Sequence, residues 1–318
     1  MQERKNAITV GISAVMLALV IRLFSAAQPQ QQDQPPSVTQ PSLQETETYP
    51  VMPYPTMPGK KPPEISAQEG QAVQLNDLAQ YEPDVQALLL SPLSWNLQSD
   101  APTVLIVHTH ATESYTRQPG EAYIEDSDYR TLDENYNMLS IGRELAQLLR
   151  QSGIQVIHDK TLHDYPSYSG SYEHARQSIK AHLAQYPSIC MVIDLHRDAL
   201  DFDKDPQLTT LAQVDGQRSA QLMLVAGTDR NLEYPGWQEN LALGVKLTAV
   251  LERQNPGITR PIQLRAQRFN LDLTPGSLLV EVGANGNTHD EALVAVRALA
   301  EAILELSQGA NLENAPPF

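Results

Sequence analysis

Short apolar runs alternate with amphipathic stretches from residue 103 onwards, and this alternation constrains the fold more than any other feature. The runs are apolar on both faces, which is typical of strands in a covered sheet. The stretches between them carry apolar residues at helical spacing. This order predicts one α/β domain whose mainly parallel sheet is sandwiched between helices. The expected strands are residues 103–108, 154–159, 189–196, 220–227, 261–266 and 277–283, and the expected helices are residues 135–153, 172–186, 236–254 and 290–307.

The N-terminal segment is apolar and follows basic residues. Arg4 and Lys5 precede an apolar stretch that reaches residue 24, close to the lower limit of about 17 residues for a membrane-spanning helix. Residues 1–27 are therefore expected to form a signal anchor or transmembrane segment, with cleavage after the small residues 25–27 as the alternative. Because positive charge before the apolar stretch stays in the cytoplasm, the main domain is expected to be membrane-anchored and outside the cytoplasm.

The composition changes again before the main domain. Residues 28–66 are rich in Gln, Pro, Thr and Ser and keep no helical or strand period, which is typical of a disordered linker. Residues 67–102 mix weak helical periodicity with turn signals and are expected to lead into the main domain, residues 103–308. Residues 309–318 are expected to form a tail.

Charge and cysteine content exclude several kinds of site. Lys and Arg number 22 against 38 Asp and Glu, a formal net charge of −16 at pH 7, so nucleic acid is not an expected partner. The single cysteine, Cys190, lies in an apolar run. It cannot form an intramolecular disulfide, and a zinc site made of several thiolates is excluded.

Imidazole and carboxylate side chains gather at the ends of three expected strands. In an open α/β sheet ligands bind beyond the carboxyl ends of the strands, so these side chains are candidates for a functional site. They are His108, His110 and Glu113 after the first strand, Asp194, His196, Arg197 and Asp198 after the third, and Glu281 in the last.

A zinc site accounts for this set most simply. Catalytic zinc commonly takes three protein ligands and a water molecule. His110 and Glu113 are three residues apart and can bind one ion from a single loop, and His196 would fix that ion to the sheet. Glu281 interrupts an apolar strand, where burial of a carboxylate without purpose is costly, so we expect it to be a catalytic general base.

The other polar residues at the strand ends are expected to have supporting or structural roles, and not to bind the metal. His108 continues the strand and is expected to support the site more than to bind zinc. Asp194 and Asp198 are expected to orient His196, since a metal-bound imidazole usually needs a hydrogen-bond acceptor. Arg197 either stabilises a developing oxyanion or forms an ion pair with one of these aspartates. The remaining histidines, His158, His163, His174, His182 and His289, are expected at the surface or in loops.

Six long motifs carry a resemblance to a known family. They are "VLIVHTHATESY", "YRTLDENYNMLSIGREL", "VIHDKTLHDYPSYSGSY", "VIDLHRDA", "QLMLVAGT" and "RFNLDLTPGSLLVEVGANGNT", in this order between residues 104 and 288. They resemble the stage II sporulation protein P family of peptidoglycan hydrolases, which is related to the zinc-dependent N-acetylmuramoyl-L-alanine amidases. The likeness extends over about residues 103–306. One departure is Leu271, which stands where the family often has glutamine.

The resemblance implies a fold, an activity and partners. The fold is a three-layer α/β sandwich on a mixed sheet. The activity is zinc-dependent cleavage of the amide between N-acetylmuramic acid and L-alanine, with an endopeptidase activity on crosslinked stem peptides. The partners are peptidoglycan glycan strands and stem peptides, and membrane-bound engulfment proteins that include a lytic transglycosylase. Carried onto this chain, the ligands are His110 and His196, and Glu281 assists the water. The carboxylate ligand is Glu113 or, by likeness to the wider amidase superfamily, Glu134.

Two other functions remain open at this point. A carboxypeptidase-like zinc metallopeptidase would need a basic residue for the substrate carboxylate, and Arg197, Arg265 and Arg268 are the candidates. A non-catalytic wall-binding scaffold would tolerate the loss of Glu281 and of the metal.

Overall fold

The computed structural model describes residues 73–93, 96–121, 129–200 and 208–313. The expected anchor, residues 1–27, and the expected linker, residues 28–66, lie outside these ranges. Within them, no helix combines the length and the apolar character that crossing a membrane requires.

Within the described ranges, seven strands form one sheet in the order β1-β8-β7-β9-β4-β2-β3. Five of its six strand pairings are parallel, and only β7 pairs with β9 in the antiparallel sense. The predicted α/β class is confirmed, with a sheet that is mixed and mainly parallel. The strands are β1 (Leu75–Asp77), β2 (Val104–Val107), β3 (Val156–His158), β4 (Met191–Asp198), β7 (Leu222–Gly227), β8 (Ile262–Arg265) and β9 (Ser277–Ala284).

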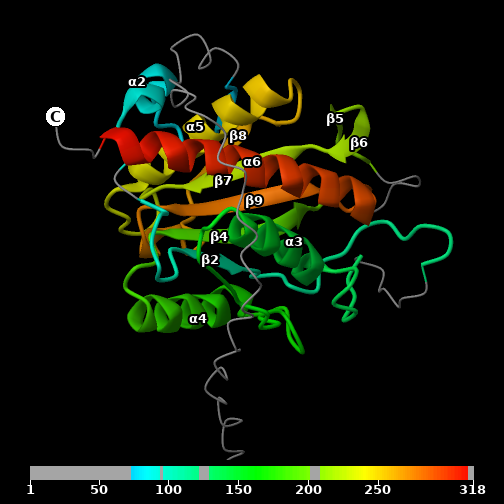
Figure 1. The fold of residues 1–318 in the computed structure, drawn as a ribbon. Coiled ribbons are helices and arrows are strands. Elements are labelled where there is room, and N and C mark those ends of the chain that lie inside the picture. Colours follow the sequence, from blue (N-terminus) through cyan, green and yellow to red (C-terminus); the bar gives the residue numbers. More distant parts are fainter. Residues whose placement is uncertain (1–72, 94–95, 122–128, 201–207, 314–318) are drawn as a thin grey trace, which may run out of the picture. The chain divides into compact units, whose positions relative to one another are not determined.

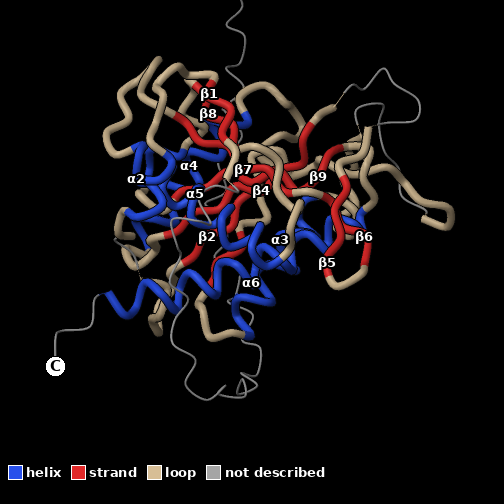
Figure 2. Tube along the Cα trace, turned by 90° about the horizontal axis from the view of Figure 1, so that it is seen from above, coloured by secondary structure: helices blue, strands red, loops and turns tan. Residues whose placement is uncertain are grey.

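The single antiparallel pairing divides the sheet into two halves. Strands β3, β2, β4 and β9 run one way, and β7, β8 and β1 run the other way. The carboxyl ends of the first four strands therefore meet at one edge, whereas those of β7 and β8 lie at the opposite edge. Figure 2 shows the strands gathered at the centre with helices around them.

Helices cover the sheet because its strands are apolar on both faces. Along β2, Leu105 and Val107 pack with Ile179 of α4, while Val104 and Ile106 belong to the larger core with α3. Figure 1 shows α3 and α6 side by side, and α4 on the other side of β2. The helices are α2 (Val85–Leu90), α3 (Met138–Gln151), α4 (Ser171–Gln185), α5 (Trp237–Gln254) and α6 (His289–Glu313), with a short 3-10 turn, η2, at Leu271–Leu273.

The helix boundaries follow local chemistry. Helix α3 begins at Met138 because the Asn137 side chain accepts a hydrogen bond from Leu139 N, an N-cap. It ends two residues before Gly153, whose positive φ of 90° is incompatible with an α-helix. Its buried face includes Ile141 and Leu145, as the helical spacing predicts.

The structure adds elements that the sequence pattern did not predict. Strand β1 comes from the expected lead-in segment and pairs with β8, so this segment contributes to the same sheet. Strands β5 (Leu211–Val214) and β6 (Gln217–Ala220) form a separate antiparallel hairpin. Helix α6 continues to Glu313, beyond the expected boundary at residue 308.

Candidate active site at the ends of β2, β4 and β9

Three neighbouring strands deliver the candidate side chains to one edge of the sheet. Strand β2 ends at Val107, so His110 lies in the turn that follows and not on the strand. In the parallel register of β4 and β9, His196 lies directly beside Glu281. Side chains in register on neighbouring strands point to the same face, so the sheet holds this histidine and this carboxylate together.

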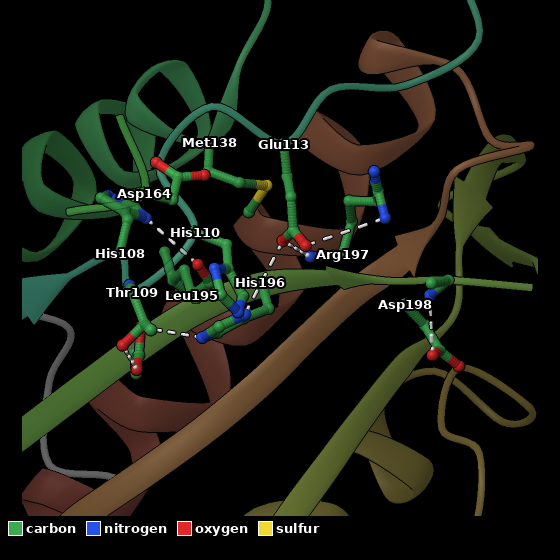
Figure 3. Close-up of polar contacts among 12 residues, drawn as sticks. His108, Thr109, His110, Glu113, Met138, Asp164, Leu195, His196, Arg197 and Asp198 are labelled. Atoms are coloured by element: carbon green, nitrogen blue, oxygen red, sulfur yellow. Dashed lines mark hydrogen bonds and ion pairs between the residues drawn. The ribbon is translucent and has the colours of Figure 1, made fainter. Parts of the chain in front are cut away.

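Three of the predicted residues, His110, Glu113 and His196, form a buried cluster. Their side chains approach one another from the turn after β2 and from β4, and Figure 3 shows Glu113 reaching toward His196. Glu113 Oε2 lies 3.7 Å from His196 Nδ1. The rings of His110 and His196 are perpendicular, with centroids 5.2 Å apart. The structure thus brings together the proposed ligands, although His110 and His196 are 86 residues apart in the sequence.

Two arginines hold Glu113 in this cluster. The backbone N–H of Arg197 donates to Glu113 Oε2 at 3.3 Å, and the Arg197 guanidinium lies 3.8 Å from Glu113 Oε1. Arg130 lies 3.5 Å from the same Oε1. Arg197 also donates from Nε to the carbonyl oxygen of Ser114 at 3.0 Å, so its buried side chain ties β4 to the turn that carries Glu113.

The two aspartates near His196 have different partners. Asp194 accepts hydrogen bonds from Thr109 N at 2.8 Å and from Thr109 Oγ1 at 2.6 Å, and its Oδ1 lies 3.0 Å from His196 Nε2. Asp198 forms an ion pair with Arg260 at 2.7 Å. Asp194 is therefore the aspartate that faces His196, whereas Asp198, the last residue of β4, pairs with Arg260.

Charge in the cluster is unevenly distributed. Burial would lower the pKa of His196, but the neighbouring carboxylates of Asp194, Glu113 and Glu281 raise it to about 10. Burial also opposes ionisation of Asp194, yet His196 and Thr109 hold its pKa at about 2. The carboxylates thus favour a positive charge at the position of His196.

Glu281 differs from the other carboxylates of the site. Burial raises its pKa to about 8, although the positive charge of His196 acts in the opposite direction. The side chain as a whole is half-buried, but its Oε2 is enclosed and has no hydrogen-bond partner. An enclosed carboxyl oxygen without a partner is a site where a proton can be held.

His108 points away from the cluster into the core. Its Nδ1 lies 3.2 Å from the carbonyl oxygen of Leu195, and its Nε2 lies 2.9 Å from Nε2 of His158. Both rings are buried, so the expectation that His158 lies at the surface or in a loop is wrong: it is the last residue of β3. Because Leu195 precedes His196, the contacts of His108 fit the supporting role that the sequence predicts.

The two candidates for the carboxylate ligand lie in different surroundings. Glu113 is only 5% exposed and belongs to the cluster. Glu134 is exposed and lies in the turn that precedes α3. The geometry therefore favours Glu113.

Aromatic side chains complete the site, and the sequence interpretation did not single them out. Tyr168 is stacked on His110, with ring centroids 4.5 Å apart and an interplanar angle of 15°. Tyr172, at the start of α4, stands edge-on to His110 at 5.5 Å. Both lie in the motif "VIHDKTLHDYPSYSGSY", whose density of tyrosine and serine outside regular structure was the available signal.

Comparison with known proteins identifies the family of the chain. The family model described as Stage II sporulation protein P (SpoIIP) matches residues 24–304. The chain belongs to this family. The curated Stage II sporulation protein P of Bacillus subtilis (strain 168) is 28% identical over 286 residues, which cover 82% of this chain and 65% of that protein. The chain thus spans about two thirds of the length of this relative.

Two of the solved structures that match this chain are amidases. The N-acetylmuramoyl-L-alanine amidase AmiC2 of Nostoc punctiforme is 15% identical, with a TM-score of 0.39, and the match covers 65% of this chain and 97% of that chain. The CwlD amidase from Clostridioides difficile, solved in complex with the GerS lipoprotein, is 16% identical, with a TM-score of 0.40, and the match covers 67% of this chain and 100% of that chain.

Proposed function

We propose that this chain is a zinc-dependent peptidoglycan hydrolase, an N-acetylmuramoyl-L-alanine amidase with an endopeptidase activity on stem peptides, acting in engulfment during sporulation. Membership of the SpoIIP family supports the sporulation role. The observation that carries the chemistry is the buried cluster of His110, Glu113 and His196 beside the enclosed carboxyl oxygen of Glu281.

The donor set fits zinc in its chemistry. Two imidazoles and a carboxylate are common ligands of catalytic zinc. Nδ1 of His110 is enclosed and has no hydrogen-bond partner. The 3.7 Å between Glu113 Oε2 and His196 Nδ1 is close to the roughly 3.3–3.5 Å that separates two ligands at tetrahedral angles around one zinc ion.

The cluster is not closed around a single point. Among the described residues, no three His, Cys, Asp or Glu side chains are arranged so that they could hold a metal ion together. Binding therefore requires a movement of side chains, of which His110 comes from a turn and His196 from a central strand of the sheet. The carboxylates that raise the pKa of His196 would equally attract a metal cation.

The chain's own residues account for the remaining steps. Zinc, when bound, would lower the pKa of a water molecule and polarise the scissile carbonyl. Glu281, in register with His196 on the neighbouring strand, would accept a proton from the attacking water and return it to the leaving amine, because burial raises the pKa of its carboxyl into the range where a proton is both taken up and released. Asp194 orients His196, and Arg197 positions Glu113 through contacts with the turn after β2.

The proposal includes a location and partners. The domain is tethered to the membrane by residues 1–27 and works outside the cytoplasm on glycan strands and stem peptides. It acts together with membrane-bound engulfment proteins, including a lytic transglycosylase. The basic residues before the apolar N-terminal stretch and the family membership support this part.

A carboxypeptidase-like activity has less support. It needs a basic side chain aimed at the substrate carboxylate, but Arg197 is buried and bonded to the turn after β2. Arg265 is exposed at the carboxyl end of β8, which lies at the opposite edge of the sheet from the cluster. Arg268, which follows it, contacts Asp272 at 3.3 Å.

Product analysis of digested cell wall tests the proposal. Purified protein is incubated with zinc and peptidoglycan, and the soluble products are separated and identified by mass. The amidase releases glycan strands without peptides together with peptides that begin with L-alanine. Release of a single C-terminal amino acid, with the amide to N-acetylmuramic acid intact, contradicts the proposal. His174→Ala, which changes an exposed histidine outside the cluster, is the matched control.

A further inference from the structure

We propose that Asp164 is a positioning residue of the site: its carboxylate holds the turn after β2, which carries His110 and Glu113, in the arrangement that the reaction needs. This inference rests on the proposed function and adds to it a residue from the loop between β3 and α4. Asp164 acts on the cluster through two neighbours, Thr112 and Arg130.

The side chain of Asp164 is buried and faces the turn after β2. It is 0% exposed, and a carboxylate is rarely buried so completely unless it is paired. Among the described residues, its hydrogen bonds go to Thr112 and Arg130. The Thr112 N–H donates to both carboxylate oxygens at 3.3 Å, and the Thr112 hydroxyl donates to Oδ2 at 2.6 Å. A buried charge of one loop is thus satisfied by donors from a turn that lies 52 residues away in the sequence.

Thr112 connects this carboxylate with the cluster. It is only 5% exposed, and its hydroxyl, which donates to Asp164, also accepts a hydrogen bond from Arg130 Nη1 at 3.2 Å. Its carbonyl oxygen accepts a hydrogen bond from Thr131 N at 2.8 Å. The N–H, the carbonyl and the hydroxyl of Thr112 are therefore all bonded. This fixes the backbone on both sides of Thr112, and Glu113 follows directly.

Asp164 also determines where the guanidinium of Arg130 lies. Its Oδ2 accepts a charge-assisted hydrogen bond from Arg130 Nη1 at 2.7 Å. The other terminal nitrogen, Nη2, lies 3.5 Å from Glu113 Oε1, which is longer than the roughly 2.7–3.2 Å of a hydrogen bond. Without the charge of Asp164, the guanidinium would be drawn toward Glu113, the other carboxylate that it contacts. Asp164 thus keeps Arg130 from occupying the carboxylate of the cluster.

A second aspartate–arginine pair provides the matched control. Asp272 lies 2.6 Å from Arg176, and their side chains are 9% and 18% exposed, close to the 0% and 19% of Asp164 and Arg130. This pair joins η2 to α4, and in the part of the chain that the structure describes its hydrogen bonds do not reach the turn after β2. Asp272→Asn therefore removes an ion pair of the same kind and leaves the contacts of that turn in place.

Hydrogen exchange and steady-state kinetics of the full chain test the inference on wild type, Asp164→Asn and Asp272→Asn. Asparagine keeps the shape of the side chain, but one acceptor oxygen becomes an NH2 group and the charge that holds Arg130 is lost. Mass spectrometry reports the exchange rate of the Thr112 amide hydrogen. We expect this hydrogen to exchange roughly 10-fold faster in Asp164→Asn, because it loses a hydrogen bond to a charged group. On soluble peptidoglycan fragments, kcat should fall by roughly 10- to 100-fold with KM within about threefold of wild type.

The control separates positioning from a general loss of stability. Asp272→Asn should lose a similar share of its stability to urea and keep wild-type exchange at Thr112 and wild-type kcat. If exchange at Thr112 in Asp164→Asn stays within twofold of wild type, or if kcat falls equally in both variants, the inference is wrong.

Two further outcomes are decided in advance. If Asp164→Asn does not fold, Thr112→Val removes the same contact from the side of the turn, and a wild-type kcat in that variant overturns the inference. If wild type releases no peptides from glycan strands, the proposed function fails, while the exchange rate still decides whether Asp164 holds the turn.

Discussion

Gly142 supports the buried histidine pair, and its replacement by alanine is a direct test of the packing beneath the site. Gly142 lies on α3 against His108 and His158. A Cβ atom at this position would lie 2.3 Å from His108 Nε2 and 2.6 Å from His158 Nε2. Both distances are far below van der Waals contact, and both rings are buried in an interior that is expected to be close-packed.

The expected loss of stability follows from three terms. Overpacking of a core costs about 1–3 kcal/mol. Separation of the two imidazoles, now 2.9 Å apart, leaves buried polar nitrogens unpaired at a further cost of about 1–3 kcal/mol. The higher helix propensity of alanine offsets about 1 kcal/mol. Gly142→Ala should therefore lower the free energy of unfolding by about 3 kcal/mol, or roughly 6–12 °C in Tm for a domain of this size.

Gly244→Ala is the matched control, since Gly244 also lies within a helix, α5. There a Cβ atom would meet Leu224 Cδ1 at 3.7 Å, an ordinary contact. Gly244→Ala should leave the protein as stable as wild type or more stable by up to about 1 kcal/mol. Urea unfolding followed by circular dichroism measures both variants. Equal stability of Gly142→Ala and Gly244→Ala would refute the packing argument.

Two further predictions concern the carboxylate ligand and the neutral core histidine. Glu113→Ala should lose most of its bound zinc in elemental analysis, whereas Glu134→Ala should retain it; the reverse result would make Glu134 the ligand.

Burial is the main cause that lowers the pKa of His158 well below its ordinary value, and the nearby His108 lowers it further. In mildly acidic solution the unfolded chain therefore binds a proton at His158 that the folded chain does not bind. The stability that this neutral histidine contributes is complete above pH 6.5 and is lost as the pH falls. Urea unfolding should therefore show wild type losing its advantage over His158→Asn between pH 6.5 and pH 5, by up to about 1.4 kcal/mol per pH unit, and a constant difference would contradict this.

Much of the fold was predictable because apolar runs and helical spacing determine which faces are buried. The six expected strands and four expected helices are present, with ends that differ by a few residues. Strand β1 was not predictable, because its three residues show no period and depend on pairing with β8. The hairpin of β5 and β6 was predictable from the Asp215-Gly216 pair, because both residues adopt the positive φ that a two-residue hairpin turn requires.

The site was predictable in its residue types but not in its supporting contacts. Histidines and carboxylates after apolar strands indicated His110, Glu113, His196 and Glu281, since the ends of parallel strands meet at one edge. Tyr168 could not be assigned, because its contact with His110 depends on the path of an irregular loop.

The role of Arg197 likewise depends on the position of a loop. The sequence suggested either an oxyanion contact or an ion pair with a nearby aspartate. The structure shows contacts with Glu113 and the Ser114 carbonyl, which come from the turn after β2. Spacing along β4 carries no information about that turn.

Zinc content and wall digestion, measured together on wild type, His196→Ala and Glu281→Gln, test the central claim most directly. We predict that wild type holds zinc and digests peptidoglycan, and that His196→Ala loses both. Glu281→Gln should keep its zinc and lose roughly 100- to 10,000-fold in rate, because it can neither take nor return the proton. Full zinc content in His196→Ala, or normal digestion by Glu281→Gln, would contradict the account.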